Sequence, residues 1–297
     1  MVTGIAALEK GKVTEYEQIY DTGVYNLAHK PVCWIYTSSK IGHGYLNMVR
    51  ALEQSCNYYF YELGTRIGID TLEQYARYFG LGSKTGIELP GETAGNVAGK
   101  KAAEKDGEQW SVGSTLSAAI GQSYNNFSPI QMAKYVAMIA NGGHAVDPTL
   151  VRAIYNADGS EVSKKEIKSY VKEKLNLSND KEEKLEISEK NIKTIKEGMK
   201  LVTTSPSGTA YSIFKDFDIT VAGKTGSAQA GDVTNGWFVG FAPYKKPEIA
   251  VAVLIEDGAT GGATGTVARE VIAQYFGMNA SNIKEDVTAL PTVEIQR

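Results

Sequence analysis

The sequence predicts an α+β fold, with helices concentrated in the first half of the chain and an antiparallel sheet near its end. Helical periodicity is clearest from Leu46 to Phe79 and over residues 130–140, whereas the clearest strand-like runs lie beyond residue 206. The run Ile249–Ile255 is apolar on both faces, which is typical of a strand buried between two layers of helices. We therefore expect a sheet that is covered on both faces.

The first 80 residues predict helices separated by one long irregular stretch. Residues 1–10 predict an amphipathic helix that ends at Gly11, although no capping residue precedes it. Residues 13–45 are mixed in composition and predict loops with short extended pieces. The helical pattern resumes at Leu46 and is broken near Ser55. A further short helix is expected over residues 71–79.

The middle of the chain alternates between loops and charged helices. Residues 83–114 are rich in glycine and predict a long loop, and a strongly apolar helix follows over residues 130–140. Residues 149–163 predict a hairpin. Residues 161–197 hold ten lysines and nine acidic residues, which favours a pair of solvated helices.

The last third predicts three strands and a final helix. The strands are expected at residues 218–222, 236–242 and 249–255, and the helix at residues 267–276. We accordingly divide the chain into a mainly helical lobe, a segment of hairpin and charged helices, and a segment of sheet strands with the C-terminal helix. Their boundaries are 1–148, 149–205 and 206–297.

Composition excludes several functional classes. The net charge of −3 does not indicate a nucleic-acid-binding protein. No run approaches the ~20 apolar residues of a membrane span. Two cysteines, Cys33 and Cys56, are too few for a disulfide framework. The histidines show no metal-ligand spacing with each other or with the cysteines, so no metal and no cofactor is predicted. They are His29, His43 and His144.

The sharpest motif is Lys224-Thr225-Gly226-Ser227, which resembles the third motif of the serine penicillin-recognising enzymes. Lys224 would place a fixed positive charge beside a nucleophile, and the hydroxyls of Thr225 and Ser227 would bind a substrate carboxylate. Gly226 would let substrate backbone lie close along the strand. The resemblance also implies that the amide of Ser227 forms half of an oxyanion hole. A second copy at residues 84–86 lies in a predicted loop, and we interpret it as structural.

Ser55-Cys56-Asn57 resembles the second motif of the same enzymes. The resemblance implies that Ser55 relays a proton to the leaving amine and that Asn57 binds the substrate's peptide group. Cys56 is interpreted as a small buried apolar residue. A Ser-x-Asn pattern is expected by chance about once in a chain of this length. The second instance, Ser123-Tyr124-Asn125, is interpreted as part of a structural loop.

The resemblance extends along most of the chain. Cys33-Trp34 with His43-Gly44, Gly80-Leu81-Gly82 and residues 89–92 are similar to segments of the elongation- and division-type class B penicillin-binding proteins. The resemblance therefore implies a β-lactamase/transpeptidase-like fold, in which helices flank an antiparallel sheet. His43 is interpreted as a structural loop histidine.

The first motif of that family, Ser-x-x-Lys, has no convincing counterpart. Four instances are interpreted as chance because all follow Ser55 and none opens an apolar helix: Ser169/Lys172, Ser178/Lys181, Ser212/Lys215 and Ser281/Lys284. Family members commonly read Gly-Ser-Thr-Phe-Lys before a helix like residues 1–9. We therefore expect Met1 to follow the place of the catalytic lysine, through an internal start, a split gene or a deliberate fragment. The resemblance also implies that two strands of the same sheet precede this motif. Without them Ile249–Ile255 would be an exposed edge, and we expect the chain to form a homo-oligomer, to swap strands or to rearrange its N-terminus.

The resemblance implies a D,D-transpeptidase that cross-links peptidoglycan stem peptides through an acyl-serine and is blocked by β-lactams. It also implies a membrane-anchored parent protein whose domain lies outside the cytoplasmic membrane. The chain by itself is expected to be inactive because it lacks the nucleophile. Two alternatives stay open: an inactive remnant or binding scaffold, and a β-lactamase or penicillin-sensing receptor.

Overall fold

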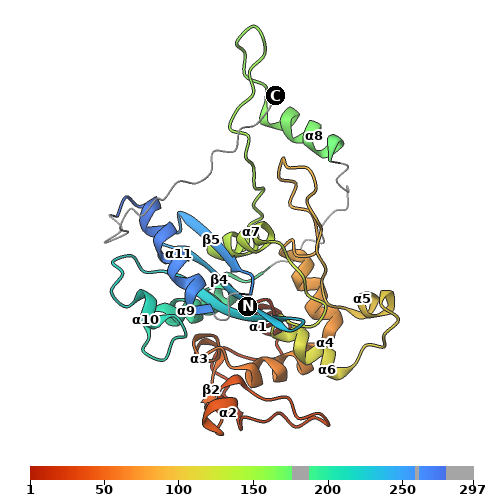
Figure 1. Ribbon diagram of the computed structural model, residues 1–297, viewed down its shortest axis with the longest axis vertical. Coiled ribbons are helices and arrows are strands. Elements are labelled where there is room, and N and C mark those ends of the chain that lie inside the picture. Colours follow the sequence, from red (N-terminus) through yellow and green to blue (C-terminus); the bar gives the residue numbers. More distant parts are fainter. Residues whose placement is uncertain (176–186, 258–260, 279–297) are drawn as a thin grey trace.

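The computed structural model describes residues 1–175, 187–257 and 261–278 (Figure 1). The helices in these ranges are α1 (Val2–Glu9), α2 (Trp34–Ser39), α3 (Met48–Glu53), α4 (Asn57–Tyr78), α5 (Lys100–Lys105), α6 (Val112–Ala119), α7 (Pro129–Ala140), α8 (Lys164–Lys174), α9 (Glu189–Thr204), α10 (Tyr211–Phe214) and α11 (Gly261–Tyr275). The strands are β1 (Ile19–Asp21), β2 (Gly44–Leu46), β3 (Ala222–Ala230), β4 (Val233–Ala242) and β5 (Ile249–Ile255).

Strands β3, β4 and β5 form an antiparallel sheet in that order, and helices cover both of its faces (Figure 1). Side chains of β4 alternate between two apolar cores. Phe238 packs in the core beneath α11, whereas Val239 and Phe241 pack in the core shared with α7 and α9. The covered sheet and the α+β class are therefore confirmed. Among the described residues β5 pairs only with β4 and lies at the sheet edge.

Two predicted helices are more deeply buried than their sequences indicate. The helix α1 was expected to be amphipathic, but every residue from Thr3 to Leu8 is buried, because α4 and α9 pack around it. The helix α9 was expected to be solvated. Its charges occupy one face only, and Ile195 and Met199 on the other face are fully buried against the core. The expectation of a solvated helix holds for α8, which has no buried residue and extends away from the body (Figure 1).

The predicted loops contain short helices that the sequence pattern did not indicate. The expected loop at residues 83–114 holds α5 and the start of α6, where the side chain of Ser111 caps the helix by accepting from the amide of Ser114. Within residues 13–45, α2 was missed. These helices are one or two turns long, too short to display a helical period. The expected helix at 71–79 is the second half of α4, which kinks at Gly68.

The boundaries of the last elements also need correction. The strand expected at residues 218–222 begins at Ala222 and runs to Ala230, whereas β5 has the predicted bounds. The final helix α11 starts at Gly261, six residues earlier than expected. The expected hairpin at 149–163 is reduced to a turn closed by one bridge between Tyr155 and Glu161. Among the described residues, none of the helices combines the length and apolar character needed to cross a bilayer.

Candidate active site

Ser55 and Lys224 lie 169 positions apart in sequence and meet in the fold. Ser55 lies in the link between α3 and α4, where its φ of 53° places it in the left-handed region. Lys224 extends from β3. Its Nζ donates to Ser55 Oγ at 2.7 Å and to the backbone carbonyl of Thr225 at 2.8 Å. The two predicted motifs are therefore brought into direct contact.

Burial changes the acid–base chemistry of Lys224. Desolvation lowers the pKa of its ammonium group to about 8, because the charged form loses water and gains only neutral oxygen partners. At neutral pH the group is still mainly protonated and donates to Ser55. A lysine with a pKa close to the working pH can pass and recover a proton at low cost, which suits a proton relay through the Ser55 hydroxyl.

The pair forms part of the wall of a cavity of about 670 Å³. All six residues predicted for the site line this cavity: Ser55, Asn57, Lys224, Thr225, Gly226 and Ser227. Further polar residues outside the two motifs also line it, among them Thr3, Gln122, Asn125 and Thr209. Gln122 Nε2 donates to the carbonyl of Ser227 at 3.3 Å, and the hydroxyls of Thr209 and Thr225 lie 2.7 Å apart. Gln122 directly precedes the Ser123-Tyr124-Asn125 segment, and no pattern in the sequence pointed to Thr209.

The second copies of both motifs have structural partners. In the second Lys-Thr-Gly, the backbone and hydroxyl of Thr85 both donate to the carboxylate of Glu92. In the second Ser-x-Asn, Asn125 accepts from the amide of Ala98 and donates to the carbonyls of Ala118, in α6, and Gln122. The local hydrogen bonds of Thr85 agree with its interpretation as structural, whereas Asn125 also lines the cavity.

None of the described Ser-x-x-Lys instances reaches the cavity. Ser169 is exposed on α8, and Ser212 is exposed on α10. Neither residue belongs to the cavity lining. The pairs Ser178/Lys181 and Ser281/Lys284 lie outside the described residues. The interpretation of the described instances as chance therefore agrees with their positions.

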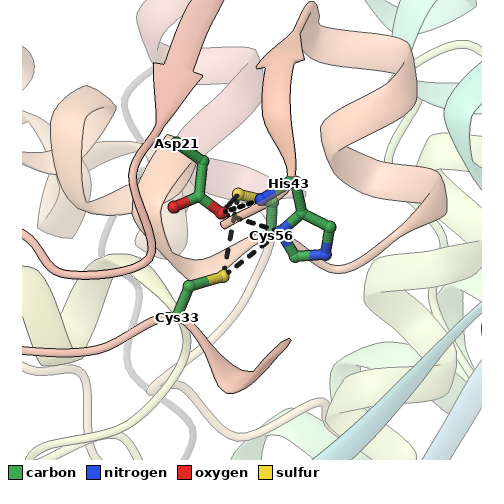
Figure 2. Close-up of side chains that lie close together, drawn as sticks. All are labelled: Asp21, Cys33, His43 and Cys56. Carbon is green, nitrogen blue, oxygen red and sulfur yellow. Dashed lines mark hydrogen bonds and ion pairs between the residues drawn. The ribbon is translucent and has the colours of Figure 1, made fainter. Parts of the chain in front are cut away.

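A second polar cluster lies directly behind Ser55. The side chains of Asp21, Cys33, His43 and Cys56 point toward one another, and their nearest ligand-type atoms all lie within 4.8 Å (Figure 2). Sequence spacing gave no sign of this cluster, because its members come from four separate segments. Cys56 is fully buried, as expected, but its Sγ also lies 3.3 Å from Asp21 Oδ2 and 3.8 Å from Cys33 Sγ.

The cluster shares protons and negative charge. Burial opposes the charge of His43, but contacts with Asp21 and Cys33 outweigh it and raise the pKa of the imidazole to about 9. Burial likewise opposes ionisation of Asp21, yet donors from His43 and Gly23 hold the pKa of its carboxyl well below the usual range. The Cys56 thiol and the His43 ring stabilise the thiolate of Cys33 and lower its pKa to about 5. The carboxylate of Asp21 and the thiolate of Cys33 thus both lie against the imidazolium of His43.

Comparison with known proteins places these features in a family. The family described as penicillin binding protein transpeptidase domain matches residues 1–276. The chain belongs to this family. Peptidoglycan D,D-transpeptidase MrdA of Acinetobacter baumannii is 34% identical over 294 residues, covering 92% of this chain and 40% of the relative. The MrdA of Escherichia coli K12 is 30% identical and covers 98% of this chain and 46% of the relative.

Solved structures of transpeptidase-family proteins have the same fold. Pseudomonas aeruginosa PBP2 in complex with WCK 5153 has a TM-score of 0.80 at 29% identity, covering 97% of this chain and 62% of that protein. Helicobacter pylori PBP2, solved as a complex with MreC, has a TM-score of 0.75 at 28% identity, covering 94% and 48%. The β-lactamase/transpeptidase-like fold expected from the sequence is thereby confirmed. The chain spans less than half the length of these curated relatives.

Proposed function

We propose that the full-length protein is a serine D,D-transpeptidase that cross-links peptidoglycan stem peptides, and that this chain supplies one half of its active site. The observation that supports this most directly is the contact between Lys224 Nζ and Ser55 Oγ at 2.7 Å. It joins two motifs of the family at the wall of one cavity. Two relatives that cover nearly all of this chain are named peptidoglycan D,D-transpeptidases.

Each residue of this half-site has a role that fits its position. Ser55 relays a proton toward the leaving amine, with Lys224 as its neighbour. Asn57, at the first turn of α4, hydrogen-bonds the peptide group of the substrate. The hydroxyls of Thr225 and Ser227 bind the substrate carboxylate, and the amide of Ser227 forms part of the oxyanion hole.

The nucleophile and its lysine base come from a Ser-x-x-Lys segment that this chain does not supply to the cavity. Met1, Val2 and Thr3 line the cavity, so a segment joined to the beginning of α1 would lie at the same wall. With that segment in place, a serine hydroxyl attacks the stem-peptide or β-lactam carbonyl, the C–N bond breaks, and the nitrogen leaves with the proton that the serine gave up, so that an acyl-serine forms. Without it, none of the Ser-x-x-Lys serines among the described residues lines the cavity.

Benzylpenicillin tests the assignment. The full-length protein should gain the mass of one penicilloyl group on a serine upstream of α1, whereas this chain alone should gain none in intact-mass measurements. In the full-length protein, Lys224→Ala should slow acylation by about 100-fold or more, since it removes the charge beside the nucleophile. The matched control is Lys84→Ala in the second Lys-Thr-Gly, which should leave the acylation rate unchanged. Equal loss in both variants, or an adduct on this chain alone, would contradict the proposal.

The same experiment separates the alternatives. Rapid release of the penicilloyl group with turnover of the antibiotic would favour a β-lactamase, whereas no acylation of any form would favour a remnant or scaffold. We further propose that the full-length protein is membrane-anchored with this domain outside the cytoplasmic membrane. Protease accessibility of the domain in intact spheroplasts checks that placement.

We also propose that the chain by itself self-associates through the edge of β5. The strand is apolar and pairs on one side only among the described residues, which leaves backbone groups open to a second copy. Sedimentation velocity should show a dimer or larger species. Leu254→Lys on this strand should shift the distribution toward monomer, because edge charges oppose strand pairing. A monodisperse monomer of the unaltered chain would contradict the proposal.

A further inference from the structure

Thr209 brings a hydroxyl into the candidate active site from outside both sequence motifs. Its Oγ1 lies 2.7 Å from Thr225 Oγ1, and both residues line the cavity. Thr209 belongs to the link between α9 and α10, whereas Thr225 lies on β3. We propose that Thr209 is a positioning residue, which directs the hydroxyl hydrogen of Thr225 toward the substrate carboxylate. This inference rests on the proposed function, which assigns carboxylate binding to Thr225.

The hydrogens of the two hydroxyls have only one arrangement once a carboxylate is bound to Thr225. Each threonine hydroxyl donates one hydrogen and accepts at its lone pairs. Without a carboxylate, either of the two hydroxyls can donate to the other. An ionised carboxylate only accepts, so it takes the single hydrogen of Thr225. The contact of 2.7 Å is then kept only if Thr209 donates to Thr225 Oγ1.

A hydroxyl that accepts a hydrogen bond becomes a better donor. The bond from Thr209 polarises the O–H group of Thr225, and hydrogen bonds in such a chain strengthen one another. The bond from Thr225 to the substrate is charge-assisted, because its acceptor is ionised. Thr209 therefore raises the affinity for a carboxylate without touching it. A substrate analogue with a neutral ester in place of the carboxylate does not share this gain, because it has no ionised acceptor.

The backbone around Thr209 holds its hydroxyl in place. The amide of Thr209 donates to the carbonyl of Glu53 at 3.4 Å, two residues before Ser55. The preceding residue, Gly208, packs directly against α9. A Cβ at this glycine would lie 2.3 Å from the carbonyl oxygen of Leu201, so no larger residue fits without a shift of the backbone. The link between α9 and α10 is therefore fixed beside both motifs of the site.

Thr225 is anchored independently on the other side of this contact. It pairs with Phe238 in the register of β3 and β4. Thr203, on α9, donates its buried hydroxyl to the carbonyl of Val221 at 2.6 Å, directly before β3. The hydroxyls of Thr209 and Thr225 thus meet between two segments that are each held by other contacts. A donor held in place before the substrate arrives needs no reorganisation when the substrate binds.

Acylation kinetics of the full-length protein test the inference. Varying the concentration of benzylpenicillin separates the dissociation constant of the noncovalent complex from the rate constant of acylation. Thr209→Val removes the hydroxyl and keeps the shape of the side chain. It should raise the dissociation constant about 5- to 10-fold, as expected for the loss of one net hydrogen bond, and leave the rate constant unchanged. Thr209→Ala should raise it as well, whereas Thr209→Ser keeps the hydroxyl and should restore most of the affinity.

The matched control is Thr204→Val, at the end of the neighbouring helix α9. This variant removes an exposed hydroxyl that donates to the carbonyl of Lys200, away from Thr225. Its dissociation constant and rate constant should equal those of the unaltered protein. Equal weakening by Thr204→Val and Thr209→Val would overturn the inference, because the loss would then reflect the packing of α9.

Two comparisons distinguish positioning from a direct contact between Thr209 and the substrate. In a protein that carries Thr225→Val, adding Thr209→Val should leave the dissociation constant almost unchanged, because the hydroxyl through which Thr209 acts is gone. Benzylpenicillin methyl ester, which lacks the carboxylate, should bind the Thr209→Val and unaltered proteins equally. Additive losses in the double variant, or the same weakening for the acid and the ester, would contradict the inference.

The unaltered full-length protein separates a failure of this inference from a failure of the proposed function. If benzylpenicillin does not acylate it, the proposed function is wrong and the inference is wrong with it. If it is acylated, and Thr209→Val has the same dissociation constant as the unaltered protein, the inference alone is overturned.

Discussion

Two buried polar regions meet at residues 55–56, and they differ in how the sequence encodes them. The contact between Ser55 and Lys224 joins two short motifs whose residue types and order are visible in the chain. The neighbouring cluster of Asp21, Cys33, His43 and Cys56 takes one residue from each of four segments. A motif concentrates its chemistry in a few positions, whereas a cluster assembled by the fold leaves no local pattern.

The two regions also treat buried charge differently. Lys224 is surrounded by neutral oxygens, so burial is uncompensated and the pKa of its ammonium falls to about 8. In the cluster, the carboxylate of Asp21 and the sulfur of Cys33 face the imidazole, and the pKa of His43 rises to about 9. The buried charge of Lys224 therefore destabilises the fold, whereas the opposite charges of Asp21 and His43 stabilise each other.

The largest expected effect on stability comes from removing Asp21 from its buried ion pair with His43. Asp21→Ala should lower the free energy of unfolding by about 3–5 kcal/mol, since it leaves the buried His43 without its carboxylate partner. It also removes the acceptor of the Gly23 amide. Urea unfolding at neutral pH measures the change.

An exposed ion pair provides the control for this prediction. Asp70 pairs with Lys100, but the two side chains are 75% and 55% exposed. Asp70→Ala should therefore cost less than about 1 kcal/mol. A similar loss of unfolding free energy for Asp21→Ala and Asp70→Ala would show that the buried Asp21–His43 pair contributes no more to stability than an exposed pair.

Removing the buried charge of Lys224 should stabilise the fold. Lys224→Met should raise the free energy of unfolding at pH 7 by up to about 3 kcal/mol, because the buried ammonium no longer has to be desolvated. Some of this gain is offset because the Ser55 hydroxyl loses its donor. Thermal and urea unfolding at pH 7 measure the difference.

The dependence of the free energy of unfolding on pH distinguishes the loss of the Lys224 charge from a change in side-chain packing. The pKa of Lys224 is about 8 in the folded state and near its usual 10.5 when unfolded, so the unfolded state binds more protons between these values. Stability of the unaltered chain should therefore rise from pH 8 to pH 10.5, with the full penalty present below pH 8. The contribution of this group should be missing from the Lys224→Met profile. Parallel profiles would argue against a buried lysine.

The sequence predicted best those parts of the molecule whose signal lies in consecutive residues. The apolar run of β5 has the predicted bounds, and the motifs at Ser55 and Lys224 meet in the fold. The two-turn helix α5 and the cap at Ser111 were missed because glycine-rich flanks concealed them. Thr209 joined the site only through packing of distant segments.

The smallest effect concerns the backbone of Ser55, where the two regions meet. A φ of 53° disfavours any residue with a Cβ, whereas glycine adopts it freely. Ser55→Gly and Ser55→Ala lose the same hydroxyl, so their difference isolates the backbone term. We expect the glycine variant to be more stable by about 1 kcal/mol in urea unfolding. Equal stabilities would mean that the link between α3 and α4 relaxes once the contact with Lys224 is lost. The left-handed conformation would then depend on the contact between Ser55 and Lys224 rather than on the neighbouring cluster.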